Sequence, residues 1–493
     1  MEINIFKTVT IIDRENSLKY INKEGIAKLP KSITAIGKEA FYCCEQLEKI
    51  DLSECEKLGT IGDGAFKCCP SLKEVKLPKS ITAIGEEAFY SCKQLEKIDL
   101  SEFDKLETIG DRTFKYCSSL KEAKLPKSIT AIGESAFNSC EQLEKIDLSE
   151  CEKLVIIGDA AFEAFWSSSL KEAKLPKSIT AIGEEAFHGC KQLEKIDLSE
   201  CEKLEIIGDA AFAAFCRCSS LKEVKLPKSI TAIGEEAFYC CEQLEKIDLS
   251  ECEKLGTIGD GAFKCCPSLK EVKLPKSLTA IGKEAFYGCE QLEKIDLSEC
   301  EKLVIIGDAA FAAFWSSSLK EAKLPKSITA IGKEAFYRCK QLEKIDLSEC
   351  EELETIGDGT FSECKSLKEV KLPKSITAIG ESAFNSCGQL EKINLSECDK
   401  LERIDDEAFK ECEALNDSFL ASYFKRKEEK KIEEKRLKEE KLEAERKLKA
   451  ERIRKLKAER KLKAEEERDK TAKIAGLILL IMFISYLILR FMI

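Results

Sequence analysis

Apolar and polar side chains alternate in a short pattern that returns along most of the chain. The segment at residues 46–55, QLEKIDLSEC, occurs eight times, twice with one residue changed. Its L-x-x-I-x-L spacing has the period of two that is typical of a half-buried strand. Such a strand directs Ile50 and Leu52 inward and Lys49 and Asp51 outward.

These strand patterns belong to a repeat of nearly fixed length. The string LPKSITAIG, once LPKSLTAIG, recurs every 48 to 51 residues, and each block between two copies holds two strand patterns. Its prolines are Pro30, Pro78, Pro126, Pro176, Pro227, Pro275, Pro325 and Pro373. Sixteen units of about 23–25 residues result, a period that indicates a solenoid in which stacked units share one core.

Each unit continues after the strand with I-G-x-x-A-F. We expect Gly62 and Gly85 to adopt a backbone turn that a Cβ atom would forbid. One phenylalanine per unit follows, from Phe41 and Phe66 to Phe409, sixteen in all. These phenylalanines are predicted to form a stacked internal column that belongs to the core.

Two motifs carry a resemblance to a known family. The string from Leu47 to Leu58 fits L-x-x-L-x-L-x-x-C-x-x-L, the leucine-rich repeat pattern. The companion string LPKSITAIGKEAFYCCEQL resembles the BspA-like, or treponeme-type, leucine-rich repeat. The resemblance covers about residues 29–415 and implies a curved α/β solenoid with a parallel sheet. It also implies protein–protein contact or adhesion, often at bacterial or protist surfaces.

The 26 cysteines follow the repeat. Fourteen of sixteen units have Cys three residues before the strand leucine, and seven of eight long units have a second Cys. Ser167, Ser316 and Phe103 fill the exceptions, so we expect the column cysteines to be small buried hydrophobic residues. Neighbours in a column should lie about 5 Å apart, which also permits disulfides.

Composition argues against several kinds of chemistry. No C-x-x-C pair occurs, so we expect no metal site and no cofactor. The one histidine, His188, stands where other units have Tyr or Asn, and is predicted to be a surface variant. No P-loop, G-x-S-x-G or H-E-x-x-H motif is present, so we expect neither an enzyme nor a small-molecule substrate.

Outward positions of successive strands carry opposite charges. Parallel stacking would form two ladders along the concave sheet, made of Lys49, Asp51, Glu74, Lys76, Lys97, Asp99, Glu122 and Lys124. We favour a solvated face that fixes the register of the strands. The alternative is a polar docking surface.

Three units insert two or three residues after the spine phenylalanine. The insertions contain clustered aromatics, namely Phe165, Trp166, Phe215, Phe314 and Trp315. Exposed large aromatics would be candidate protein-binding anchors. We favour the alternative, an extra helical turn that folds back and buries them.

The C-terminal part has a different composition. Residues 425–473 hold 22 Lys and Arg against 14 Asp and Glu, a net of +8, whereas residues 1–424 hold 57 against 77, a net of −20. This run has no Gly or Pro and no heptad of apolar residues, so it predicts a single solvated helix of about 70 Å. The interleaved glutamates argue against nucleic-acid binding.

Residues 474–493 are apolar apart from Arg490 and long enough to cross the hydrocarbon core of a lipid bilayer. The first twenty residues have no uninterrupted apolar run of signal-peptide length. We therefore expect a C-terminal anchor. The expected organisation is an N-terminal cap (1–28), a leucine-rich repeat solenoid (29–415), a C-terminal cap (416–424), a charged stalk (425–473) and a membrane anchor (474–493).

The sequence favours a membrane-anchored interaction scaffold that binds a protein partner. The basic stalk beside the anchor and the unpaired cysteines favour a solenoid in the reducing cytosol. The alternative is a BspA-like antigen or adhesin on the cell surface, with the solenoid facing outward.

Overall fold

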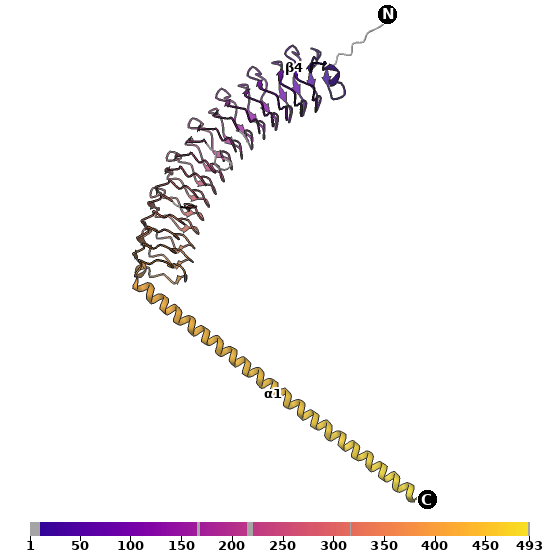
Figure 1. The fold of residues 1–493 in the computed structure, drawn as a ribbon, viewed down its shortest axis with the longest axis vertical. Helices are drawn as coiled ribbons and strands as arrows, with labels where there is room; N and C mark the ends of the chain where they lie inside the picture. Colours follow the sequence, from indigo (N-terminus) through magenta and orange to yellow (C-terminus); the bar gives the residue numbers. More distant parts are fainter. Residues whose placement is uncertain (1–9, 165–167, 214–219, 316, 492–493) are drawn as a thin grey trace. The chain divides into compact units, whose positions relative to one another are not determined.

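The computed structural model describes residues 10–164, 168–213, 220–315 and 317–491. It divides the chain into two compact units, residues 1–416 and 417–493. The first unit is a solenoid that bends into an arc (Figure 1), and the second is one long helix. The predicted fold class, a curved repeat solenoid followed by a long helix with an apolar end, is confirmed.

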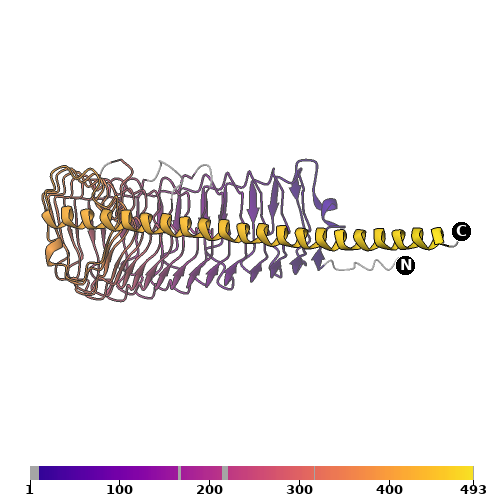
Figure 2. The same cartoon turned by 90° about the horizontal axis from the view of Figure 1, so that it is seen from below.

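The solenoid is built from two rows of short parallel strands, which lie side by side in successive turns (Figure 2). We call the row of even-numbered strands the ladder sheet. It consists of β2 (Ile26–Ala27), β4 (Lys49–Asp51), β6 (Glu74–Lys76), β8 (Lys97–Asp99), β10 (Glu122–Lys124), β12 (Lys145–Asp147), β14 (Glu172–Lys174), β16 (Lys195–Asp197), β18 (Glu223–Lys225), β20 (Lys246–Asp248), β22 (Glu271–Lys273), β24 (Lys294–Asp296), β26 (Glu321–Lys323), β28 (Lys344–Asp346), β30 (Glu369–Lys371) and β32 (Lys392–Ile393).

The odd-numbered strands are two residues long and form the second row. They are β1 (Ile11–Ile12), β3 (Ala35–Ile36), β5 (Thr60–Ile61), β7 (Ala83–Ile84), β9 (Thr108–Ile109), β11 (Ala131–Ile132), β13 (Ile156–Ile157), β15 (Ala181–Ile182), β17 (Ile206–Ile207), β19 (Ala232–Ile233), β21 (Thr257–Ile258), β23 (Ala280–Ile281), β25 (Ile305–Ile306), β27 (Ala330–Ile331), β29 (Thr355–Ile356), β31 (Ala378–Ile379) and β33 (Arg403–Ile404). Two short 3₁₀ turns, η1 (Ser17–Tyr20) and η2 (Leu395–Glu397), complete the solenoid.

The core is a column of stacked rings between the two rows. Leu47, Ile50 and Leu52 are buried, as the strand pattern predicts. The sixteen spine phenylalanines stack in sequence, with ring centroids 5.1–5.4 Å apart and interplanar angles of 1–17°. Because each ring touches one in the turn before and one in the turn after, no single unit completes its own core.

In the repeated I-G-x-x-A-F turn, the backbone at the glycine packs closely against the backbone of the preceding turn. A Cβ atom on Gly62 would lie 2.7 Å from the backbone nitrogen of Lys38 in the preceding turn. The left-handed conformation occurs two residues after this glycine, at Gly64 (φ 57°) and at Glu87 in the next unit (φ 54°). Gly62 is therefore required by the approach of two backbones rather than by its own dihedral angles.

The second unit is α1 (Ser418–Phe491), 74 residues long. Its first turn is capped by Asp417, whose Oδ1 accepts a hydrogen bond from the backbone N–H of Leu420 at 2.8 Å. Ion pairs one turn apart, such as Lys447–Glu443 at 2.8 Å and Lys473–Asp469 at 2.9 Å, support the exposed helix. By length and composition, Ser418–Arg490 contains a segment able to cross a membrane, and the side chains of that segment are exposed.

Candidate binding surfaces

The ladder sheet brings the outward charges of β4 and β6 into direct opposition. Lys49 lies opposite Glu74, and Asp51 opposite Lys76. The Nζ atom of Lys49 is 3.3 Å from a Glu74 carboxylate oxygen, and that of Lys76 is 3.6 Å from Asp51. All four side chains are about half exposed, so each pair contributes at most about 1 kcal/mol to stability.

The next two strands repeat this arrangement. Lys97 lies opposite Glu122 and Asp99 opposite Lys124 in the register of β8 and β10. Lys124 is 3.6 Å from Asp99 and 3.1 Å from Glu122 on its own strand. Lys76 and Lys124 therefore each have carboxylates on two sides.

Strand pairing divides the ladder sheet into three groups, β2 to β6, β8 to β22 and β24 to β32. β4 and β6 pair over three residues, and so do β8 and β10, whereas no strand pairing joins β6 to β8 or β22 to β24 in the described residues. Other ion pairs bridge these junctions at the strand ends, namely Lys79–Glu102 between β6 and β8 and Lys276–Glu299 between β22 and β24. The uninterrupted ladder that the sequence suggested is thus a series of paired strands joined by looser junctions.

A cavity of about 680 Å³ opens where β6 and β8 separate. The half-buried Val75 and Leu77 contribute apolar surface to its lining. The rest is charged and consists of Lys49, Lys73, Glu74, Lys76, Glu96, Lys97, Asp99, Lys121 and Glu122, together with Ser53. This cavity gathers six of the eight predicted ladder residues around a small apolar patch.

Hydrogen bonds fix the ionisation of the ladder carboxylates. The backbone N–H and the hydroxyl of Ser53 donate to Oδ1 of Asp51 at 3.0 and 2.6 Å, and together with Lys76 they lower the pKa of Asp51. Hydrogen bonds from Lys76 and Lys49 lower the pKa of Glu74. Both carboxylates therefore stay charged at neutral pH.

The third insertion presents aromatic side chains to solvent. Trp315 has 78% of its surface exposed and Phe314 has 40%. The Phe314 ring packs edge-on against Tyr287, with centroids 4.5 Å apart. The expectation that an extra helical turn would bury these aromatics is wrong for Phe314 and Trp315. Tyr287, Phe314 and Trp315 form what we call the aromatic patch.

Cationic side chains from the following turn hold the backbone of the patch. Arg338 donates from Nη1 to the carbonyl oxygen of Phe314 at 2.8 Å, and Lys340 donates to that of Trp315. Arg338 also lies over the Tyr337 ring and pairs with Glu363 at 3.2 Å. The exposed indole therefore projects from a fixed loop with two cations beside it. Phe165, Trp166 and Phe215 lie outside the described residues.

His188 was predicted to lie at the surface, and this prediction is wrong. Its side chain is 12% exposed and its Nδ1 lies 3.5 Å from the carboxylate of Glu163, a residue that sequence reasoning did not single out. Glu163 is followed by the aromatic insertion and sits in a position that other units fill with Tyr, Lys, Asn, His, Ala or Ser. Glu163 could have been found from the sequence by comparing the residue after the spine phenylalanine between neighbouring units.

Comparison with sequence models of known protein families identifies the family of this chain. The sequence model described as "BspA type Leucine rich repeat region (6 copies)" matches residues 2–105, 98–214, 161–251, 213–314 and 305–443. The chain belongs to this family of BspA-type leucine-rich repeat proteins. No curated protein matches it.

Comparison with solved structures finds leucine-rich repeat proteins that are similar to this chain. A leucine-rich repeat protein from Bacteroides ovatus is 28% identical, with a TM-score of 0.55, and the match covers 69% of this chain and 82% of that one. A leucine rich cell surface protein from Faecalibacterium prausnitzii is 23% identical over 83% of this chain and 82% of that one, with a TM-score of 0.29. A leucine-rich repeat protein from T. pallidum is 22% identical over 48% of this chain and 78% of that one, with a TM-score of 0.24.

Proposed function

We propose that this chain is a membrane-anchored protein-interaction scaffold, with its solenoid on the cytosolic side. The main support for an interaction role is the exposure of Trp315. This large aromatic side chain lies in solvent, while a contact from the next turn holds its backbone. A side chain whose backbone is already held has less conformational entropy to lose when a partner covers it. Leucine-rich repeat scaffolds are typically non-enzymatic, which agrees with this role.

The aromatic patch is the primary proposed binding site. Arg338 and Lys340 stand beside Trp315, so a partner with an acidic residue next to an apolar pocket fits this surface. The ladder sheet is the second proposed site, with the cavity between β6 and β8 as its least regular part. A partner that binds the ladder sheet would have to replace existing ion pairs. The ladder sheet is therefore a weaker candidate for the binding site than the aromatic patch.

The anchor rests on the last part of α1. Residues 474–490 are apolar except for Arg490, and the helix is long enough to cross a bilayer. The preceding 49 residues carry a net charge of +8. Because basic residues beside a span remain on the cytosolic side of a membrane, this charge supports a cytosolic solenoid.

Protease digestion of intact cells tests the orientation. We expect the solenoid to survive protease added outside intact cells and to be digested once the membrane is permeabilised. Digestion in intact cells would overturn the cytosolic arrangement and support the surface-exposed alternative.

Crosslinking tests the interaction role separately. Partners crosslinked to the full chain in cells would be identified by mass spectrometry, and binding would then be measured with the purified partner. We expect Trp315→Ala to weaken that binding, with Val155→Ala as a control at another exposed apolar side chain. Equal binding by both variants would exclude the aromatic patch.

A further inference from the structure

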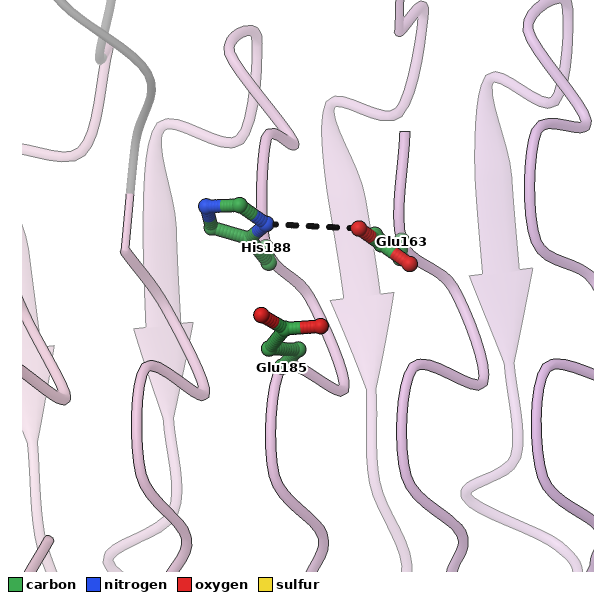
Figure 3. A group of neighbouring side chains, drawn as sticks. All are labelled: Glu163, Glu185 and His188. Carbon is green, nitrogen blue, oxygen red and sulfur yellow. Dashed lines mark hydrogen bonds and ion pairs between the residues drawn. The ribbon is translucent and has the colours of Figure 1, made fainter. Parts of the chain in front are cut away.

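One group of side chains stands apart from the apolar and ion-paired pattern of the solenoid. Glu163, Glu185 and His188 converge between two adjacent turns (Figure 3). Glu163 is only 4% exposed, and its Oε2 accepts a hydrogen bond from Nδ2 of Asn138 at 2.6 Å. On its other side, Oε1 lies 3.5 Å from Nδ1 of His188.

The same positions in other turns hold a balanced pair of charges. Lys67, which directly follows its spine phenylalanine, forms an ion pair with Glu87 of the next turn. Lys264 and Glu284 form the equivalent pair further along the solenoid. Glu163 occupies the lysine position and Glu185 the glutamate position, so two carboxylates face each other where the repeat elsewhere places opposite charges.

The two other insertion-bearing units supply internal comparisons. They have Ala213 with Glu236 and Tyr239, and Ala312 with Glu334 and Tyr337, in place of Glu163 with Glu185 and His188. Residues 308–315 read DAAFAAFW, and residues 159–166 read DAAFEAFW, a difference of one residue at Glu163. The insertion does not itself require a carboxylate at this position.

Glu163 is buried and Glu185 is half-buried, and two carboxylates this close repel each other unless a proton or a cation lies with them. One imidazole carries at most one positive charge, which leaves one negative charge when both carboxylates are ionised. A divalent ion would neutralise both carboxylates and accept the imidazole as a neutral ligand.

We propose that Glu163, Glu185 and His188 form a binding site for a divalent first-row transition-metal ion such as Mn²⁺ or Zn²⁺. Their ligand atoms all lie within 4.8 Å of one another, so small side-chain rotations bring them around one ion. Two carboxylate oxygens and one imidazole nitrogen suit this class of ion. The hydrogen bond from Asn138 orients the Glu163 carboxylate. The hydroxyl of Ser139 in turn donates to Oδ1 of Asn138 at 2.9 Å and orients the amide.

Metal binding to the full chain in detergent micelles tests the proposal. The free Mn²⁺ signal in electron paramagnetic resonance reports binding, and calorimetry reports binding of Zn²⁺. Because thiolates are poor partners for Mn²⁺, the many cysteines interfere little with the first measurement. We expect one specific site per chain that Glu163→Ala and His188→Tyr each weaken at least about tenfold.

The control variant is Glu334→Ala, which removes a carboxylate from the position that corresponds to Glu185 in another turn and leaves the three ligands intact. It changes the net charge as Glu163→Ala does, so a nonspecific charge effect would appear equally in both. Both test substitutions reproduce residues that the chain already has at Ala312 and Tyr239, and thermal unfolding in a chelator verifies that each variant folds. If neither metal distinguishes the unsubstituted chain from Glu163→Ala, the three residues form only a buried ion pair and the proposal is wrong.

Discussion

The thiol of Cys69 donates a hydrogen bond to the backbone carbonyl of Phe41 in the preceding turn, with 3.0 Å between sulfur and oxygen. The same contact recurs one turn later, where Cys92 donates to Phe66 at 3.2 Å. In the second column, Cys151 donates to the carbonyl of Pro126 at 3.5 Å. The column cysteines therefore fill the core and also satisfy carbonyls that link one turn to the next.

This contact predicts how Cys69 tolerates substitution. Cys69→Ala should lower the free energy of unfolding by about 1 kcal/mol, because the Phe41 carbonyl loses one of two donors and keeps the backbone N–H of Cys44. Cys69→Ser should cost less, since its hydroxyl can donate to the same oxygen. Denaturant unfolding of the two variants provides the measurement, and a larger loss for serine than for alanine would show that the hydrogen bond is unimportant.

Reactivity toward alkylating agents should separate the cysteines into two groups. Burial raises the pKa of Cys92 far above the ordinary value, and that of Cys190 to about 12, so these thiols remain protonated. Cys43, by contrast, is exposed. Iodoacetamide should label Cys43 in the native chain and should label the column cysteines only after unfolding.

The same experiment tests the state of the 24 free cysteines that the structure describes. Unfolding without a reducing agent should make every one of them available for alkylation, as mass spectrometry can verify. Recovery of most column cysteines in disulfides would contradict the prediction and would favour an oxidising compartment.

A pair of cysteines outside the columns should react with its own pH dependence. Cys240 and Cys265 occupy the same left-handed position in adjacent turns, with φ of 57° and 61°. A hydrogen bond from Cys265 lowers the pKa of Cys240 to about 7. The labelling rate of Cys240 should therefore rise steeply between about pH 6 and pH 8, since the thiolate is the nucleophile.

Removing the donor provides the control for this pair. In Cys265→Ala the thiolate of Cys240 loses its hydrogen bond, so its labelling at pH 7 should slow. An unchanged rate and pH profile would mean that the two thiols do not interact.

The spine and the strands could be predicted because every unit repeats the residues that specify them. Ile50 and Phe66 are buried, as are most of their counterparts in other units, and a period alone identifies their places. The prediction that a Cβ atom is excluded at Gly62 is confirmed, but the contact that excludes it comes from Lys38 in the neighbouring turn, which the sequence of one unit does not contain. The exposure of Trp315 could not be predicted, since an insertion has no repeated neighbour to fix its path.

The cluster of Glu163, Glu185 and His188 could not be predicted from the sequence for a related reason. Glu163 and Glu185 are 22 residues apart, and each occupies an ordinary position of its own unit. Their proximity becomes visible only when equivalent positions of adjacent turns are aligned in space. A site in a solenoid can therefore be formed by residues at equivalent positions of adjacent turns, and no motif within one unit reveals it.

Deletion of residues 474–493 should give a soluble chain that keeps its folded solenoid. The solenoid and α1 are separate compact units, and the apolar side chains of the helix end are exposed. Removing them takes away apolar surface without removing core contacts. Gel filtration and thermal unfolding of the truncated chain provide the test, and a substantially lower unfolding temperature would reveal that the helix end stabilises the solenoid.

The relative contributions of the two proposed binding surfaces can be separated by matched substitutions. In the ladder sheet, Lys49→Glu combined with Glu74→Lys reverses both charges while keeping a pair of opposite sign. Ion pairs at this exposed face are screened over about 8 Å at physiological salt, so we expect the swap to change partner binding little. Trp315→Ala removes the most exposed aromatic anchor, and burying such a side chain contributes about 2 kcal/mol or more at an interface hot spot. We therefore expect Trp315→Ala, alone or with Trp166→Ala, to weaken binding of the purified partner by about thirtyfold or more. A partner that binds the tryptophan variants normally and is lost with the charge swap would instead be bound by the ladder sheet.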